Sequence, residues 1–120
     1  MKIVGLHHVQ LAMPAGEEVA ATEFYEDLLG IPRVAKPSRL EVKGGCWFES
    51  EAVRIHLGVE GDFRPAKKAH PALLVDDLDA LQSRLADAGV SMVDDQSLPG
   101  FRRFYVSDPF GNRIEILSPE

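Results

Sequence analysis

Apolar and polar residues alternate near the start of the chain in the period of a β-strand. Over residues 5–13, Val9, Leu11 and Met13 fall on one face, and His8 falls on the other face. One face of this strand is therefore apolar and suits a core. The opposite face can hold functional side chains.

The pattern then changes to that of a helix. Over residues 17–29, Ala20, Phe24 and Leu28 recur every four residues, and Ala21 and Tyr25 flank this stripe. Gly30 is typical of a helix end. Short apolar runs after this helix predict three further strands, at residues 33–36, 45–50 and 53–60.

The second half of the chain repeats this order. Residues 70–76 predict a strand, and Asp76 or Asp77 can cap a helix that ends at Gly89. The apolar stripe of that helix comprises Leu78, Leu81, Leu85 and Ala88. Three strands follow it, at residues 90–93, 103–107 and 113–117. The sequence therefore predicts an α+β protein with a β-α-β-β-β module written twice.

The repeat extends to individual residues. Arg54-Ile55-His56-Leu57 resembles Arg113-Ile114-Glu115-Ile116, at an offset of 59 residues from 54 to 113. The first strands correspond as well, because His8 and His70 lie 62 residues apart. Nearly equal offsets are expected of a duplicated unit. We therefore expect one domain over residues 1–120, with modules at 1–60 and 69–120 joined by 61–68.

Four chemically active residues occupy equivalent polar positions in the two modules. They are His8, His56, His70 and Glu115, and each lies opposite the apolar face of its strand. A lone histidine is more often structural than functional, but the repeat makes a shared role the better explanation. Imidazole nitrogens and a carboxylate suit a divalent transition metal such as Zn, Ni, Fe or Mn. The pattern predicts a metal site formed when the modules pair.

Composition narrows the class of partner. The chain has 120 residues and a net charge of −6, and each half contributes −3, so there is no basic patch for nucleic acid or an anionic membrane. The single cysteine, Cys46, excludes an internal disulfide, and no apolar run is long enough to be a membrane span. We expect a cytoplasmic protein with a small-molecule substrate.

Several motifs together resemble a known family. Leu6-His7-His8-Val9, the helix end at residues 24–30, Ala69-His70, and Asp108-Pro109-Phe110-Gly111-Asn112-Arg113-Ile114-Glu115 are similar to the vicinal-oxygen-chelate superfamily. That superfamily includes glyoxalase I, extradiol dioxygenases, fosfomycin-modifying enzymes and bleomycin-binding proteins. The resemblance covers essentially the whole chain.

This resemblance implies two βαβββ modules that form a curved mixed sheet around a metal pocket, commonly within a homodimer. By the same resemblance His8, His70 and Glu115 are metal ligands. His56 stands where glyoxalase I carries a fourth ligand, a glutamate that also moves protons. His56 is therefore expected either to complete the ligand set or to act as a base beside it, so His56 and Glu115 are the candidate catalytic residues.

Other residues are candidates for contact with the substrate. Tyr105 and Arg103 alternate with apolar neighbours on one predicted strand, and Trp47 could form a wall of the pocket. Residues 94–102 are long enough for a lid, although an ordinary surface loop explains them equally well. The alternative is that Arg103 is a solvent-exposed charge and that Trp47 only packs in the core.

The favoured function is a metal-dependent, glyoxalase-like enzyme, either of the lyase or isomerase type or of the extradiol dioxygenase type. Its substrate would be a small dicarbonyl, diol or thiohemiacetal whose neighbouring oxygens bind the metal. The alternative is a non-catalytic protein that sequesters a cationic antibiotic of the bleomycin type, which the net charge of −6 would assist. A metabolite-binding regulatory domain is a third possibility.

Overall fold

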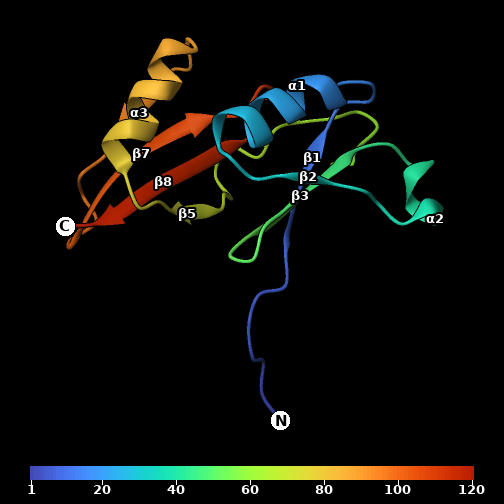
Figure 1. Ribbon diagram of the computed structural model, residues 1–120, viewed down its shortest axis with the longest axis horizontal. Coiled ribbons are helices and arrows are strands. Elements are labelled where there is room, and N and C mark those ends of the chain that lie inside the picture. The colour runs from blue at the N-terminus through green and yellow to red at the C-terminus, as the bar shows by residue number, and fades with distance from the viewer. The chain divides into compact units, whose positions relative to one another are not determined.

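Each half of the chain forms its own four-stranded sheet with helices on one side (Figure 1). The computed structural model describes residues 1–120, which divide into unit 1, Met1–Arg64, and unit 2, Pro65–Glu120. The boundary falls between Arg64 and Pro65, inside residues 61–68. None of the helices has the length and hydrophobicity that a bilayer span requires.

Unit 1 contains four strands and three helical segments. In chain order they are β1 (Val9–Met13), α1 (Glu18–Thr22), the π-helical segment η1 (Glu23–Leu28), β2 (Arg33–Val34), α2 (Ser38–Glu41), β3 (Cys46–Glu49) and β4 (Arg54–Val59). Unit 2 follows the same plan without the additional short helix. Its elements are β5 (Ala72–Leu74), α3 (Leu78–Asp87), β6 (Met92–Asp94), β7 (Phe101–Ser107) and β8 (Arg113–Pro119).

The two sheets have the same topology. The strand order is β1-β4-β3-β2 in unit 1 and β5-β8-β7-β6 in unit 2. In each sheet the first strand pairs in parallel with the last, and the remaining pairs are antiparallel. Both units are thus mixed βαβββ modules, and the predicted α+β class is confirmed.

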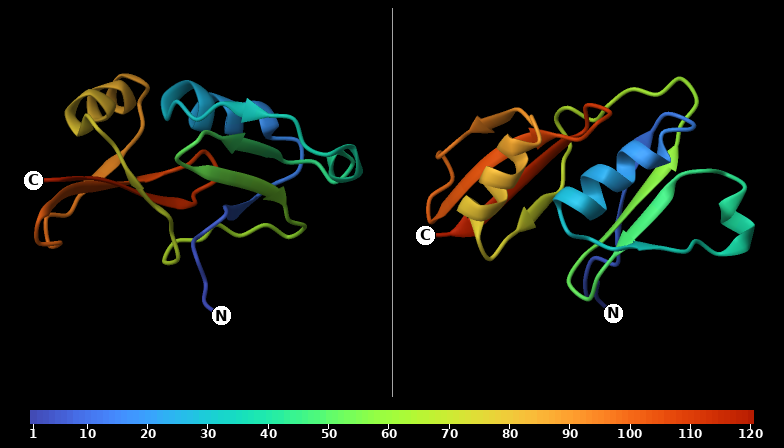
Figure 2. Two further views of the ribbon diagram at one scale, coloured as in Figure 1. Left: turned by 60° about the horizontal axis from the view of Figure 1, so that its bottom comes forward. Right: turned by 45° about the horizontal axis from the view of Figure 1, so that its top comes forward.

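The helices cover only one face of each sheet (Figure 2). In unit 1 the buried apolar residues are Leu11, Met13, Ala21, Phe24, Tyr25, Ile31, Cys46, Phe48, Ile55 and Leu57. In unit 2 they are Leu78, Leu85, Phe104, Val106, Ile114, Ile116 and Leu117. The strand residues among them, except Leu117, point toward the helix side. The alternate residues on the opposite face are therefore left for a site.

The first helix differs from the simple α-helix that the period predicts. It is α-helical only to Thr22 and continues as η1, where Leu29 N–H donates to the Phe24 carbonyl oxygen. A π-helical turn contains more residues than an α-helical turn, so the rotation from one side chain to the next is smaller. This allows the neighbouring residues Phe24 and Tyr25 both to be buried. The buried stripe consequently runs through Ala21 and Tyr25 rather than Ala20 and Leu28.

The helix α3 begins and ends as the sequence predicts. The Asp77 side chain accepts a hydrogen bond from the Ala80 backbone N–H at 3.0 Å, and Gly89 takes a positive φ of 77° just after the helix. Leu78 and Leu85 are buried, whereas Ala88 is exposed. Asp77, rather than Asp76, is therefore the residue that caps this helix.

The short helix α2 was not predicted from the sequence. It is a single turn that begins after Pro37, and Leu40 N–H donates to the Pro37 carbonyl oxygen at 2.8 Å. None of its residues is buried. A single exposed turn shows no hydrophobic period, so sequence pattern cannot reveal it.

We expect Asp77→Ala to lower the free energy of unfolding by about 1 kcal/mol, because the Ala80 N–H loses its capping acceptor. Urea denaturation followed by circular dichroism measures this change. Asp76→Ala removes the same charge one residue earlier and is the matched control, with an expected change below about 0.5 kcal/mol. Equal destabilisation by the two substitutions would contradict the assignment of the cap.

Candidate metal and substrate site

The two histidines of unit 1 lie together on the face of the sheet opposite the helices. His56 is directly opposite Gln10 on β1 and Trp47 on β3. Its ring stacks on Trp47 with centroids 4.0 Å apart and planes 4° apart, and on His8 at 4.3 Å and 20°. His56 is only 3% exposed, whereas His8 is exposed. Three rings therefore form a continuous stack with His56 at its centre.

A carboxylate fixes the orientation of the His56 ring. The Nε2 atom of His56 is 2.6 Å from Oε2 of Glu49, whose side chain is 26% exposed. A carboxylate accepts only, so Nε2 carries the proton when Glu49 is ionised, and Nδ1 is then the acceptor of a neutral ring. Glu49 was not among the predicted site residues. It lies seven positions before His56, and only the β3–β4 register brings the two together.

The stacking also bears on metal binding in unit 1. An imidazole binds a metal in the plane of its ring, at a nitrogen lone pair. The His8 and His56 rings are stacked with nearly parallel planes, so their nitrogen lone pairs do not point to a common position. One ion therefore cannot bind both rings. In this arrangement only one of the two histidines can contribute to a given metal site.

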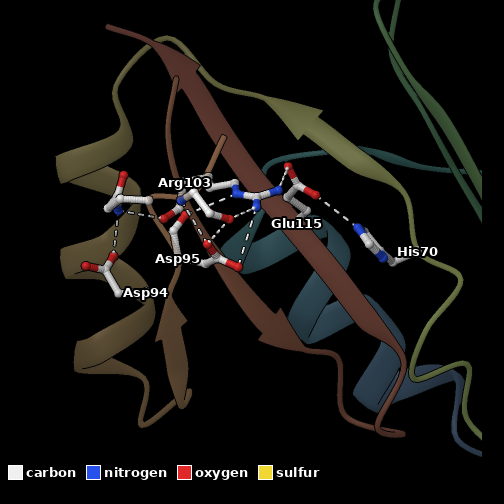
Figure 3. Close-up of polar contacts among 7 residues, drawn as sticks. His70, Asp94, Asp95, Arg103 and Glu115 are labelled. Atoms are coloured by element: carbon white, nitrogen blue, oxygen red, sulfur yellow. Dashed lines mark hydrogen bonds and ion pairs between the residues drawn. The ribbon is translucent and has the colours of Figure 1, made fainter. Parts of the chain in front are cut away.

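Unit 2 brings the other predicted pair into direct contact (Figure 3). The Nε2 atom of His70 is 2.9 Å from Oε1 of Glu115, and its Nδ1 atom is 2.8 Å from the Lys68 carbonyl oxygen. Both neighbours are acceptors when Glu115 is ionised, but a neutral imidazole has only one N–H to donate. If that proton is on Nδ1, the lone pair of Nε2 faces the Glu115 carboxylate.

This arrangement fits a cation at Nε2. Two donor atoms at right angles around an ion with bonds of about 2.1 Å lie about 3 Å apart, close to the observed separation. A backbone carbonyl that accepts from the second ring nitrogen is the usual partner of a metal-binding histidine. The donor set of His70 and Glu115 therefore matches a divalent transition metal.

The second oxygen of Glu115 is held by Arg103. Nη1 of Arg103 lies 3.3 Å from Oε2 of Glu115, and its Nε donates to the Asp95 carbonyl oxygen at 3.0 Å. The Nη2 atom lies 3.0 Å from Oγ of Ser97 and 3.4 Å from Oδ2 of Asp95. Figure 3 shows Arg103 between Glu115 and the residues after β6. Arg103 thus positions Glu115 and leaves Oε1 facing His70.

These contacts shift two ionisation equilibria. Burial alone would lower the pKa of Arg103, but its hydrogen bond to Glu115 and the nearby acidic groups raise it. Hydrogen bonds from the Ser97 side chain and backbone lower the pKa of the Asp95 carboxyl. Both residues therefore remain charged around neutral pH. The 94–102 segment, predicted as a lid or a surface loop, is anchored to β7 through Asp95 and Arg103.

The remaining predicted residues have defined surroundings. Tyr105 is directly opposite Glu115 on the neighbouring strand and meets the His70 ring edge to face at 5.4 Å. Trp47 is half-buried against His56. Cys46 is buried on the helix side of its sheet, where burial raises the pKa of its thiol.

Neither unit assembles a complete metal site from its own residues. No three side chains of His, Cys, Asp or Glu come together in a geometry that could hold an ion. Unit 1 places His8 beside His56, and unit 2 places His70 beside Glu115.

Comparison with solved structures gives relatives that cover nearly the whole chain. A crystal structure described as that of a glyoxalase family protein from Bacillus anthracis is 45% identical, with a TM-score of 0.96, over 100% of this chain and 98% of that chain. An integron cassette protein from the mobile metagenome of Vibrio cholerae is 27% identical, with a TM-score of 0.73, over 98% and 97%.

A more distant relative shares the fold alone. The fosfomycin resistance protein FosX from Listeria monocytogenes is 17% identical, with a TM-score of 0.77, over 99% of this chain and 96% of that chain. A search of the curated proteins finds no match. The family model for the Glyoxalase/Bleomycin resistance protein/Dioxygenase superfamily matches residues 5–116. With its two βαβββ modules and this match over nearly its full length, the chain belongs to the Glyoxalase/Bleomycin resistance protein/Dioxygenase superfamily.

Proposed function

We propose that the protein is a metal-dependent enzyme that binds two neighbouring oxygens of a small substrate. The observation that carries this proposal is the position of His70. Its Nδ1 faces the Lys68 carbonyl oxygen while its Nε2 faces the Glu115 carboxylate, so a neutral ring, which has one N–H for two acceptors, leaves one nitrogen lone pair facing an oxygen. A divalent cation between Nε2 and Oε1 satisfies both groups.

In this proposal three residues hold the ion: His8, His70 and Glu115. When bound, the ion would chelate the two substrate oxygens and stabilise negative charge that develops on one of them. Two histidines and one carboxylate leave further positions for substrate, and this set suits Zn, Ni, Fe or Mn. Arg103 keeps Glu115 in place through its second oxygen.

His56 is assigned the role of a proton acceptor instead of a ligand. Glu49 accepts from Nε2, which leaves Nδ1 of the neutral ring as the site for a proton. Stacking between Trp47 and His8 prevents the ring from turning away from Glu49. This carboxylate–imidazole pair can remove a proton from a substrate and hold it.

Metal binding is the direct test of the proposed function. Protein freed of metal with a chelator is titrated with Zn²⁺, Ni²⁺, Mn²⁺ and Fe²⁺ under anaerobic conditions, by calorimetry and by thermal unfolding. We expect one ion per chain and, at free metal 100-fold above Kd, a stabilisation of about 2.7 kcal/mol. Absence of binding and of stabilisation by all four ions would overturn the proposal.

The same titration separates the proposed ligands from their neighbours. His8→Ala, His70→Ala and Glu115→Gln should each weaken binding by at least about 100-fold, because loss of a ligand exceeds the effect of losing an outer partner. Glu60→Gln is the control for an exposed glutamate. This control should bind within about threefold of the unmodified chain. A control as damaging as the ligand variants would refute this ligand set.

We also propose that the protein is a homodimer. The segment before β1 is extended and leaves Ile3, Val4 and Leu6 at 94%, 95% and 80% exposure. The strand that it leads into is the edge of its sheet, so its outer backbone groups are available for pairing. A second copy would cover this apolar segment.

Light scattering after size-exclusion chromatography should give twice the chain mass of 13.2 kDa. The double substitution Ile3→Ser and Leu6→Ser should shift the population toward the monomer, because it removes the apolar contact surface. Val19→Ser with Val93→Ser changes two exposed apolar residues elsewhere and should leave the mass unchanged. A monomer at all protein concentrations would contradict the proposed dimer.

A further inference from the structure

Arg113 carries a positive charge that no carboxylate compensates. Its backbone N–H donates to the Ala66 carbonyl oxygen at 2.9 Å, but its half-buried guanidinium makes neither an ion pair nor a hydrogen bond. The guanidinium instead lies 4.3 Å from the centroid of the Tyr105 ring. The other arginines of the same sheet differ, because Arg102 pairs with Asp79 and Arg103 pairs with Glu115.

The internal repeat supplies a comparison within the chain. Arg54 occupies the position in unit 1 that corresponds to Arg113 in unit 2. In unit 1 the residue opposite Arg54 is Glu49, and the two side chains approach to 4.0 Å. In unit 2 the residue opposite Arg113 is Ser107, which carries no charge. The neutralising carboxylate is present in one unit and absent from the other.

The unpaired guanidinium belongs to the face that carries the proposed metal ligands. Arg113 and Glu115 alternate with buried isoleucines on β8, so their side chains leave the same side of the sheet. Tyr105 lies opposite Glu115, and its ring contacts the His70 ring and the Arg113 guanidinium. The Tyr105 hydroxyl group makes no hydrogen bond within the chain. A hydroxyl donor and a guanidinium are therefore available beside the Glu115–His70 pair.

The Arg113 guanidinium is available to an anion although the chain is acidic. Arg103 is held by Glu115 and Asp95, whose two negative charges balance those of Arg103 and Arg113, so these four groups are neutral together while Arg113 has no carboxylate partner of its own. A guanidinium presents a planar set of donors that matches carboxylate and phosphate oxygens. Contact with the Tyr105 ring holds it in one orientation without using those donors.

We infer that Arg113, supported by Tyr105, binds an oxyanion of the substrate, namely a carboxylate or a phosphate-type group. This inference rests on the proposed function, because it places the anion beside the oxygens that the metal would chelate. The substrate class is then an acidic compound with two neighbouring oxygens, instead of a neutral dicarbonyl or diol.

The test measures anion binding by the full chain without metal. Uniformly ¹⁵N-labelled protein is titrated with glycolate and, separately, with inorganic phosphate at constant ionic strength. The Arg113 Nε–Hε resonance and the backbone amides of β8 are followed by NMR. We expect a saturable shift with a Kd in the millimolar range for at least one anion. Glycolate binding identifies a carboxylate, and phosphate binding identifies a phosphate-type group.

Variants distinguish binding from a purely structural role of Arg113. Arg113→Gln should weaken anion binding by about tenfold or more, whereas Arg113→Lys, which keeps the charge, should weaken it about threefold. Tyr105→Phe keeps the ring and removes the hydroxyl, with an expected loss of about threefold. Arg102→Gln makes the same change of charge on β7 and should have no effect on the Kd. Thermal unfolding confirms that each variant is folded.

Shifts that do not saturate, or an equal Kd for Arg113→Gln and the unmodified chain, would overturn the inference. Because no metal is present, this result does not depend on the metal titration. Loss of anion binding with intact metal binding therefore refutes only the anion site. Anion binding without metal binding refutes only the proposed metal-dependent function.

Discussion

His70 lies between two acceptors, the Lys68 carbonyl oxygen and the Glu115 carboxylate, and much of unit 2 is arranged around this contact. The parallel pairing of β5 with β8 brings these residues to one face. Arg103 holds the far oxygen of Glu115 and is itself held by Asp95, so the near oxygen has little freedom to turn from His70. A neutral His70 ring has only one N–H for these two acceptors.

The two units share a fold but have specialised differently. At the centre of each sheet an aromatic residue lies opposite the key polar residue: Trp47 opposite His56, and Tyr105 opposite Glu115. In unit 1 the imidazole is buried, stacked on both sides and bonded to Glu49. In unit 2 the carboxylate is surrounded by cationic and imidazole groups. The duplicated scaffold thus places a stacked imidazole bonded to a carboxylate in one unit, and a carboxylate between an arginine and a histidine in the other.

Periodicity predicted most of the fold because each sheet has a single buried face, so strands such as β1 and β8 show their orientation in the sequence. The α2 turn and the change to η1 lack such a signal. The repeat also singled out four residues that the structure brings into two contacts, His8 with His56 and His70 with Glu115. Glu49 and Arg113 were missed because their importance depends on register, which decides that Glu49 meets His56 whereas Arg113 faces uncharged Ser107.

The ligand set proposed for the metal, with His56 outside the coordination shell, can be tested by locating the ion. A crystal structure of the Mn²⁺-loaded protein, with anomalous diffraction recorded to locate the metal, gives its position. We expect one anomalous peak per site, within bonding distance of His8, His70 and Glu115, and a His56 ring that remains against Glu49. A peak that lacks any of these three ligands, or a His56 nitrogen bonded to the metal, would rule out the proposed ligand set.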